Sequence, residues 1–91
     1  MTREVQDNPA MRRYELTIAG TTAFVQYRLD DNAIALLHTE VPSELAGQGV
    51  GSALVKGVLD AARERGLKVV PRCAFVANYI ERRPEYQDLL A

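Results

Sequence analysis

Apolar and polar positions alternate along the first half of the chain. Residues 14–19 alternate in this way and end at Gly20, which predicts a half-buried β-strand. Residues 21–29 contain Thr, Phe, Val and Tyr, which fit a pleated, half-buried surface and predict a second strand. A third and more apolar run covers residues 33–41, after the turn cluster Asp30-Asp31-Asn32. Three consecutive strands with short connections predict an antiparallel meander.

The period changes to that of a helix after Pro42. Within residues 53–65, apolar side chains recur three and four positions apart, and charged residues occupy the opposite side. Residues 67–71 are expected to form a short apolar strand. The chain then returns to helical spacing from Cys73 or Ala74 to Arg82, before Pro84 ends the helix. Because strand, helix and strand form a crossover, we expect the third and fourth strands to be parallel neighbours.

The resulting order, βββαβα, predicts an α+β (mixed α/β) domain in which helices cover a mixed sheet. A chain of 91 residues fits one domain with one core, so we expect residues 1–91 to form a single domain. The polar residues 1–10 are expected to be a loose lead-in. Residues 85–91 are expected to be a tail, with Leu89 and Leu90 as the positions that would dock.

Charge and cysteine content narrow the function classes. The chain has 11 basic and 12 acidic residues, a net charge of −1, which gives no reason to expect binding to nucleic acid or to an anionic membrane. No apolar run approaches the roughly 20 residues of a membrane helix, and the N-terminus lacks the apolar core of a signal peptide. With one cysteine and one histidine, neither an internal disulfide nor a metal site is expected, and the cytoplasm is the expected location.

The segment from Val41 to Ser52 joins the third strand to the helix and contains Gly47, Gly49 and Gly51. Glycine allows the backbone to approach a ligand and to adopt positive φ. The helix that follows directs its first N–H groups at the same place, and a pyrophosphate suits such a nest. The pattern departs from the dinucleotide fingerprint G-x-G-x-x-G, because Ser52 takes the third position. The alternative is a tight turn whose glycines serve geometry alone.

The glycine segment resembles the acyl-coenzyme A motif of the GNAT acetyltransferase family, Gln/Arg-x-x-Gly-x-Gly/Ala. Gly49 and Gly51 match the last two positions, and Ala46 departs from the first. A closer resemblance is to very short GNAT-like proteins that lack the usual N-terminal helices. It covers roughly residues 14–86, with Ala74 where proline and Arg83 where histidine is common. The matching segments are His38-Thr39-Glu40-Val41, Leu45-x-Gly47-Gln48-Gly49-Val50-Gly51, Val70-Pro71-x-Cys73-x-Phe75-Val76 with Tyr79, and Pro84-Glu85-Tyr86.

This resemblance implies an N-acetyltransferase that uses acetyl-coenzyme A as cosubstrate and an amine or protein as acceptor. It implies that backbone N–H groups make most of the contacts to the pyrophosphate. The shortness of the chain would leave the acceptor side open, so the alternative is a non-catalytic acyl-coenzyme A binding module. Exposed sheet edges would also permit a homodimer. The expected cofactor-binding residues are Val41, Gly47, Gln48, Gly49, Val50, Gly51 and Ser52.

Cys73 is the best candidate nucleophile. It follows Arg72 at a predicted strand end and precedes a predicted helix, and both a guanidinium and a helix N-terminus favour the thiolate. Cys73 would either accept the acyl group or flank the thioester sulfur. The alternative is a small apolar core residue.

Three further residues are candidates for proton transfer. His38, the only histidine, has the pKa range of a general base. Glu40 lies two residues on, hence on the same strand face, and the resemblance implies a glutamate base near this strand. It also implies that Tyr79 protonates the departing thiolate. The alternatives are a histidine that fixes geometry, a solvated carboxylate and a packed aromatic ring. Arg82 and Arg83 would either attract the 3′-phosphate of the coenzyme or form a solvated pair.

Overall fold

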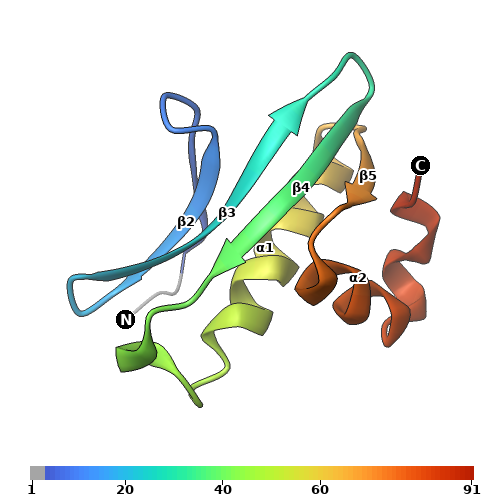
Figure 1. The fold of residues 1–91 in the computed structure, drawn as a ribbon. Coiled ribbons are helices and arrows are strands. Elements are labelled where there is room, and N and C mark those ends of the chain that lie inside the picture. Colours follow the sequence, from blue (N-terminus) through green and yellow to red (C-terminus); the bar gives the residue numbers. More distant parts are fainter. Residues whose placement is uncertain (1–3) are drawn as a thin grey trace.

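The computed structural model describes residues 4–91 of the chain. It contains a five-stranded sheet of order β1-β2-β3-β4-β5. Strands β1 to β4 pair antiparallel with their neighbours, and β4 and β5 pair parallel (Figure 1). The elements are β1 (Gln6–Asn8), β2 (Arg13–Ile18), β3 (Thr21–Leu29), β4 (Ala33–Glu40), the 3-10 segment η1 (Ser43–Leu45), α1 (Val50–Glu64), β5 (Lys68–Pro71), α2 (Ala74–Glu81) and the 3-10 segment η2 (Pro84–Leu89).

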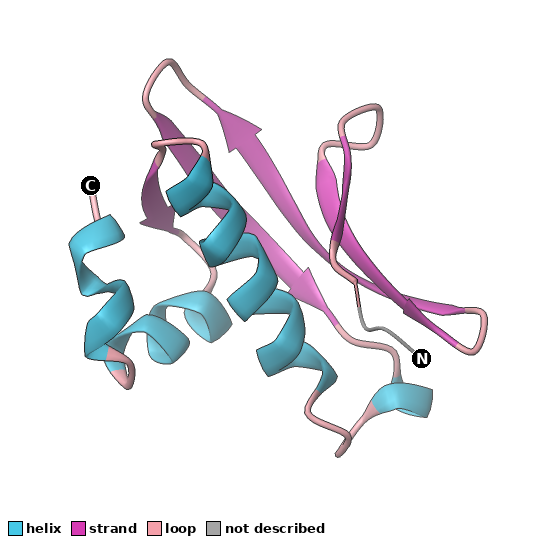
Figure 2. Ribbon diagram, turned by 180° about the vertical axis from the view of Figure 1, so that it is seen from behind, coloured by secondary structure: helices cyan, strands magenta, loops and turns pink. Residues whose placement is uncertain are grey.

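Both helices lie on one side of the sheet, which we call the inner face (Figure 2). Helix α1 contacts β2 to β5, and α2 contacts β4 and β5. Within residues 4–91, no helix covers the opposite side, which we call the outer face. The predicted mixed fold and the parallel pairing across the α1 crossover are therefore confirmed.

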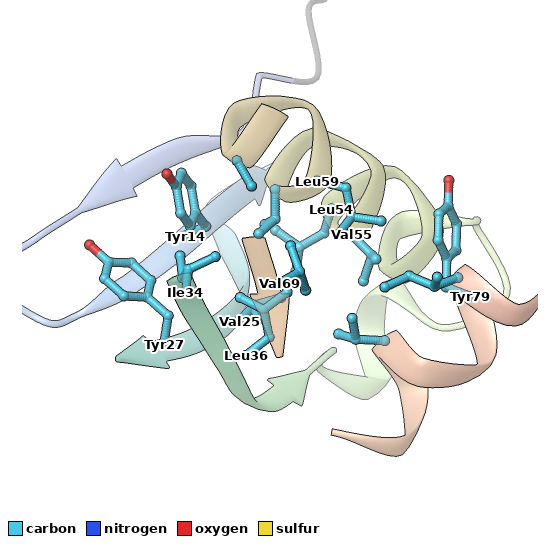
Figure 3. Close-up of a cluster of buried hydrophobic side chains, with 14 of the residues drawn as sticks. Tyr14, Val25, Tyr27, Ile34, Leu36, Leu54, Val55, Leu59, Val69 and Tyr79 are labelled. Atoms are coloured by element: carbon cyan, nitrogen blue, oxygen red, sulfur yellow. The ribbon is translucent and has the colours of Figure 1, made fainter. Parts of the chain in front are cut away.

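The core fills the space between the inner face and α1. Alternate positions of the strands point inward, and α1 presents an apolar stripe to them (Figure 3). Burying one valine, leucine or isoleucine side chain fully stabilises the fold by about 1.5–3 kcal/mol. The periodicity seen in the sequence thus corresponds to one contiguous core. Its fully buried members include Leu16, Val25, Ile34, Leu36, Leu54, Val55, Val58, Leu59 and Val69.

The N-terminal prediction is wrong where the structure describes it. Residues 1–3 lie outside the described residues, but residues 6–8 form β1 instead of a loose lead-in. The Tyr27 hydroxyl donates a hydrogen bond of 2.6 Å to the Asp7 carboxylate, and the Asn8 amide donates one of 3.0 Å to Glu15. These side-chain bonds, to Glu15 of β2 and Tyr27 of β3, hold a polar segment against the sheet. The order is therefore ββββαβα.

The C-terminal residues form the short helix η2 and dock on the rest of the fold. Arg63 makes two hydrogen bonds to the Asp88 carboxylate, of 2.8 and 3.0 Å, and the Tyr86 hydroxyl donates to Asp60 at 2.7 Å. Leu89 is buried, whereas Leu90 is 40% exposed and its backbone bridges to Val69 on β5. The tail therefore covers part of the edge of β5 that does not pair with β4.

Candidate active site

A β-bulge in β4 decides which of its residues face the helices. His38 pairs with Gln26 and Leu36 pairs with Tyr27, so Leu37 is an extra residue on β4. A bulge of this kind shifts the alternation of side chains by one position. Leu36 is fully buried on the inner face, whereas Leu37 is 44% exposed. Beyond the bulge, the inward position falls on residue 39 instead of residues 38 and 40.

His38 and Glu40 lie together on the outer face. Each pairs with an outward residue of β3: His38 with Gln26, and Glu40 with Phe24. His38 Nε2 is 2.9 Å from Glu40 Oε1, and both side chains are more than half exposed. The Phe24 ring contacts the imidazole edge-on, with 6.4 Å between the ring centroids. The predicted shared face of His38 and Glu40 is confirmed, and the pair is open to an incoming molecule.

Thr39 and Cys73 meet on the other side of the same strand. Thr39 pairs with the buried Val25 and therefore points to the inner face. Cys73 is the N-cap residue of α2, and its Sγ lies 3.4 Å from Thr39 Oγ1. The thiol donates to the hydroxyl oxygen in the neutral form, and the hydroxyl becomes the donor to a thiolate. Thr39 is not among the residues predicted from the sequence, because an unbulged strand would have turned it outward.

The surroundings of Cys73 favour its thiolate. Partial burial alone would raise the pKa of the Cys73 thiol, but the Thr39 hydroxyl and the nearby backbone groups at the start of α2 stabilise the thiolate and lower the pKa. The side chain is half-buried, so it is accessible as well as polarised. This environment is unlike that of an inert core cysteine.

The sheet opens between β4 and β5 directly beside Cys73. The last residue pair of the two strands is Leu36 with Pro71. Beyond it, the backbone N–H groups of Arg72 and Cys73 both donate to the Leu36 carbonyl at 3.0 Å, and the chain turns into α2. Strand β4 continues to Glu40 with no strand beside it on this edge in residues 4–91 (Figure 1). Backbone groups of this edge are therefore free to pair with a ligand.

The glycine segment forms the start of α1. Gly49 is the N-cap, with φ of 73°, and no side chain caps the helix. The first helical hydrogen bond runs from the Ala53 N–H to the Gly49 carbonyl, so the three N–H groups before it have no acceptor within the helix. They belong to Val50, Gly51 and Ser52. With no acidic residue in this turn, the helix end favours an anion.

Two adjoining pockets form a groove along this end of α1. The first, of about 320 Å³, is lined by the glycine segment, Val41 and Phe75. The second, of about 300 Å³, continues from Ser52 and Phe75 to Arg82 and Arg83 at the end of α2. Phe75 comes so close to α1 that a Cβ on Gly51 would lie 2.7 Å from its ring. The absent side chain of Gly51 thus allows α1 and α2 to come close, whereas Gly49 supplies the positive φ of the turn before α1.

Tyr79 lines the second pocket and lies apart from Cys73. It is six residues further along α2, which corresponds to about 9 Å along the helix axis. The Arg83 guanidinium stacks on its ring, with Cζ 3.9 Å from the ring centroid. The structure therefore brings together two pairs, His38 with Glu40 and Cys73 with Thr39, on opposite faces of β4. It does not bring Tyr79 to either pair.

The cofactor-binding residues expected from the sequence line the groove, with the exception of Gln48. The Gln48 side chain instead donates to the Glu44 carbonyl at 3.2 Å. No cluster of metal-ligating side chains occurs within residues 4–91. None of the helices in that range has the length and apolar character to cross a membrane.

Comparison with known proteins places this geometry in a family. A family model described as GCN5-related N-acetyl-transferase matches residues 13–89. The solution structure of a GCN5-like N-acetyltransferase candidate from Staphylococcus aureus is 34% identical in sequence, with a TM-score of 0.75; the match covers 98% of this chain and 88% of that chain. The resemblance carried by the glycine segment is thereby confirmed. The chain belongs to the GCN5-related (GNAT) N-acetyltransferase family, and it is an acyltransferase enzyme of that kind.

Proposed function

We propose that this enzyme transfers an acetyl group from acetyl-coenzyme A to an amine that approaches the outer face of the sheet. The observation that carries the proposal is the uncapped start of α1. Its free N–H groups open into a groove lined by Gly47, Gly49 and Gly51. Such a site fits the pyrophosphate of the coenzyme, because backbone N–H groups and the positive helix end both stabilise negative charge.

The pantetheine arm of the coenzyme would run from this groove to the open edge of β4. The arm contains amide groups, and an unpaired strand edge binds such groups through its own N–H and C=O groups. Residues 37–40 supply that edge, and Cys73 lies beside it. The thioester would then lie at this open edge, which both faces of the sheet border. Cys73 flanks the thioester sulfur in this arrangement.

The chemistry divides between the two faces of β4. On the outer face, the His38–Glu40 pair accepts a proton from the ammonium group of the acceptor, directly or through water, and so converts it to the amine that attacks. The amine nitrogen then forms a C–N bond with the thioester carbonyl, and the C–S bond breaks as the tetrahedral intermediate collapses. The nitrogen gives its second proton to solvent, and the released coenzyme thiolate takes up a proton from solvent. Tyr79, the donor that the resemblance implies, lines the other pocket of the groove, about 9 Å along α2 from Cys73, and is not given that role here. The alternative route, with the acyl group first on Cys73, leaves a trappable adduct.

Binding of the donor is tested with a matched pair of glycine variants. Gly49 and Gly66 both have positive φ and open space where a Cβ would lie, but Gly66 lies at the other end of α1. Gly49→Ala and Gly66→Ala should therefore destabilise the fold similarly, by about 1 kcal/mol. Only Gly49→Ala should weaken acetyl-coenzyme A binding, because its Cβ projects into the groove. Calorimetry and the ligand-induced rise in melting temperature measure both effects.

Two results would count against the proposed donor. One is a melting temperature that does not change at acetyl-coenzyme A concentrations far above a plausible dissociation constant. The other is equal loss of affinity in both glycine variants. Turnover is measured as free thiol released with a panel of primary amines and polyamines. Mass spectrometry of the quenched reaction shows whether Cys73 ever carries an acetyl group.

A further inference from the structure

The second pocket of the groove is positively charged. It is lined by two guanidinium groups, from Arg82 and Arg83, and by the polar side chains of Ser52 and Asn78. None of its lining residues carries a carboxylate. A pocket of this composition attracts an anion.

The two arginines also differ from three others in the chain, although Arg12, Arg28 and Arg72 likewise have no ion pair among the described residues. Arg13, Arg63 and Arg65 each lie within 4.0 Å of a carboxylate oxygen. Among the described residues, no ion pair involves Arg82 or Arg83. Their charges are therefore not neutralised inside the molecule and remain available to a ligand.

Arg83 is held in place before any ligand binds. Its guanidinium stacks on the Tyr79 ring at 3.9 Å, and the side chain is half-buried. Stacking on an aromatic face leaves the N–H groups at the edge of the guanidinium free, and their fork geometry fits phosphate oxygens. Less conformational freedom is then lost on binding than for a solvated arginine.

We propose that this pocket binds the 3′-phosphate of coenzyme A, with Arg83 as the principal contact and Arg82 as the second. The proposal rests on the proposed function, in which the pyrophosphate occupies the start of α1. From there, the coenzyme continues away from its thiol into the ribose that carries the 3′-phosphate. The second pocket begins at the same turn, because both pockets share Ser52 and Phe75. The enzyme therefore selects coenzyme A over dephospho-coenzyme A.

Tyr79 acts here as a positioning residue, through its ring. Tyr79→Phe keeps the platform under Arg83 and should retain the preference for the 3′-phosphate. Tyr79→Leu removes the platform and should reduce that preference. A role of the Tyr79 hydroxyl as proton donor predicts a different pattern, in which Tyr79→Phe lowers turnover and leaves the preference unchanged. The two variants therefore separate the ring from the hydroxyl.

The test is the ratio of dissociation constants for dephospho-coenzyme A and coenzyme A, measured by calorimetry. We expect the natural chain to bind coenzyme A at least about tenfold more tightly than dephospho-coenzyme A, as for a charge-assisted contact to phosphate. Arg83→Ala should bring the ratio close to one, and Arg82→Ala should lower it by less. Arg28→Ala is the matched control, because Arg28 is an exposed arginine of β3 that lines neither pocket of the groove. Its ratio should equal that of the natural chain.

The outcomes distinguish this proposal from the proposed function. Equal affinity for the two ligands in the natural chain would overturn the 3′-phosphate site and leave the acetyl donor in place. A preference that survives in the Arg82→Ala/Arg83→Ala double variant would overturn it as well. Failure of both ligands to bind would overturn the proposed function, and the 3′-phosphate site with it. Circular dichroism of each variant shows that the fold is intact.

Discussion

The two faces of β4 differ in chemistry although the residues that they present, His38, Thr39 and Glu40, are consecutive in the sequence. On the inner face, Thr39 contacts the half-buried Cys73, whose thiolate is favoured by the Thr39 hydroxyl and by the start of α2. On the outer face, His38 and Glu40 form a pair that is open to solvent. The strand thus separates a partly enclosed site next to the groove at the start of α1 from an exposed site that a large molecule can reach.

The difference between the faces arises from a single inserted residue. Leu37 shifts the alternation of β4, so the sequence His38-Thr39-Glu40 turns its middle residue toward the helices. In the proposed reaction, this division would hold the thioester on one face while the amine acceptor on the other face remains exchangeable. The predictions that follow test whether the two faces act separately.

The largest expected effect separates two adjacent leucines. Leu36 is fully buried on the inner face, whereas Leu37 is 44% exposed at the bulge. Leu36→Ala should lower the free energy of unfolding by about 2–5 kcal/mol because it leaves a cavity. Leu37→Ala should change it by less than about 0.5 kcal/mol, as is usual for a surface position. Urea unfolding measures both values, and equal losses would show that the bulge does not set the two faces.

The next effect concerns turnover on the outer face. Glu40→Gln should reduce the rate of acetyl transfer about a hundredfold or more, because the amide cannot accept the proton. The affinity for acetyl-coenzyme A should stay the same, since Glu40 does not line the groove. Glu15→Gln is the matched control, because Glu15 lies on the outer face two strands away. The division of roles is wrong if Glu40→Gln weakens donor binding instead of transfer.

A smaller effect concerns the inner face. Thr39→Val removes the hydroxyl that stabilises the Cys73 thiolate, so the pKa of that thiol should rise. Less thiolate is then present at neutral pH, and alkylation by iodoacetamide should be several-fold slower there and should recover as the pH rises. Thr39→Ser keeps the hydroxyl and should retain the natural pH profile. An unchanged midpoint in Thr39→Val would show that Thr39 does not stabilise the thiolate.

The smallest effect is on stability at the outer face. His38 and Glu40 are 55% and 56% exposed, so their ion pair contributes little to folding. His38→Gln should therefore change the free energy of unfolding by no more than about 1 kcal/mol while it lowers acetyl transfer. A variant that is strongly destabilised would instead indicate a structural role for His38. Urea unfolding and thiol release, measured on the same sample, distinguish the two results.

The sequence predicts those parts of the fold that repeat a local pattern. Strands β2 to β5 and both helices were predicted from the sequence, and their boundaries agree within one residue except that α1 begins three residues earlier than predicted. Strand β1 does not follow, because Gln6-Asp7-Asn8 is polar throughout and is held by Tyr27 and Glu15 from distant positions. A three-residue strand of this kind has no signal of its own.

The candidate site shows the same limit. The shared face of His38 and Glu40 follows from strand geometry alone, and the glycines predict the open turn before α1, whose binding of an anion stays a prediction. Which face these residues occupy depends on the bulge at Leu37, and nothing in the local sequence marks that residue. For the same reason, the contact between Thr39 and Cys73 was not predictable.

The most direct test of the donor site is a titration with acetyl-coenzyme A, followed in the amide ¹H–¹⁵N NMR spectrum. We predict that the largest shifts occur at the first turn of α1, at Val50, Gly51 and Ser52, and along residues 37–40 of β4. Amides of the distant β1–β2 edge should stay in place. Shifts confined to that edge, or no change at saturating ligand, would contradict the placement of the donor on this enzyme.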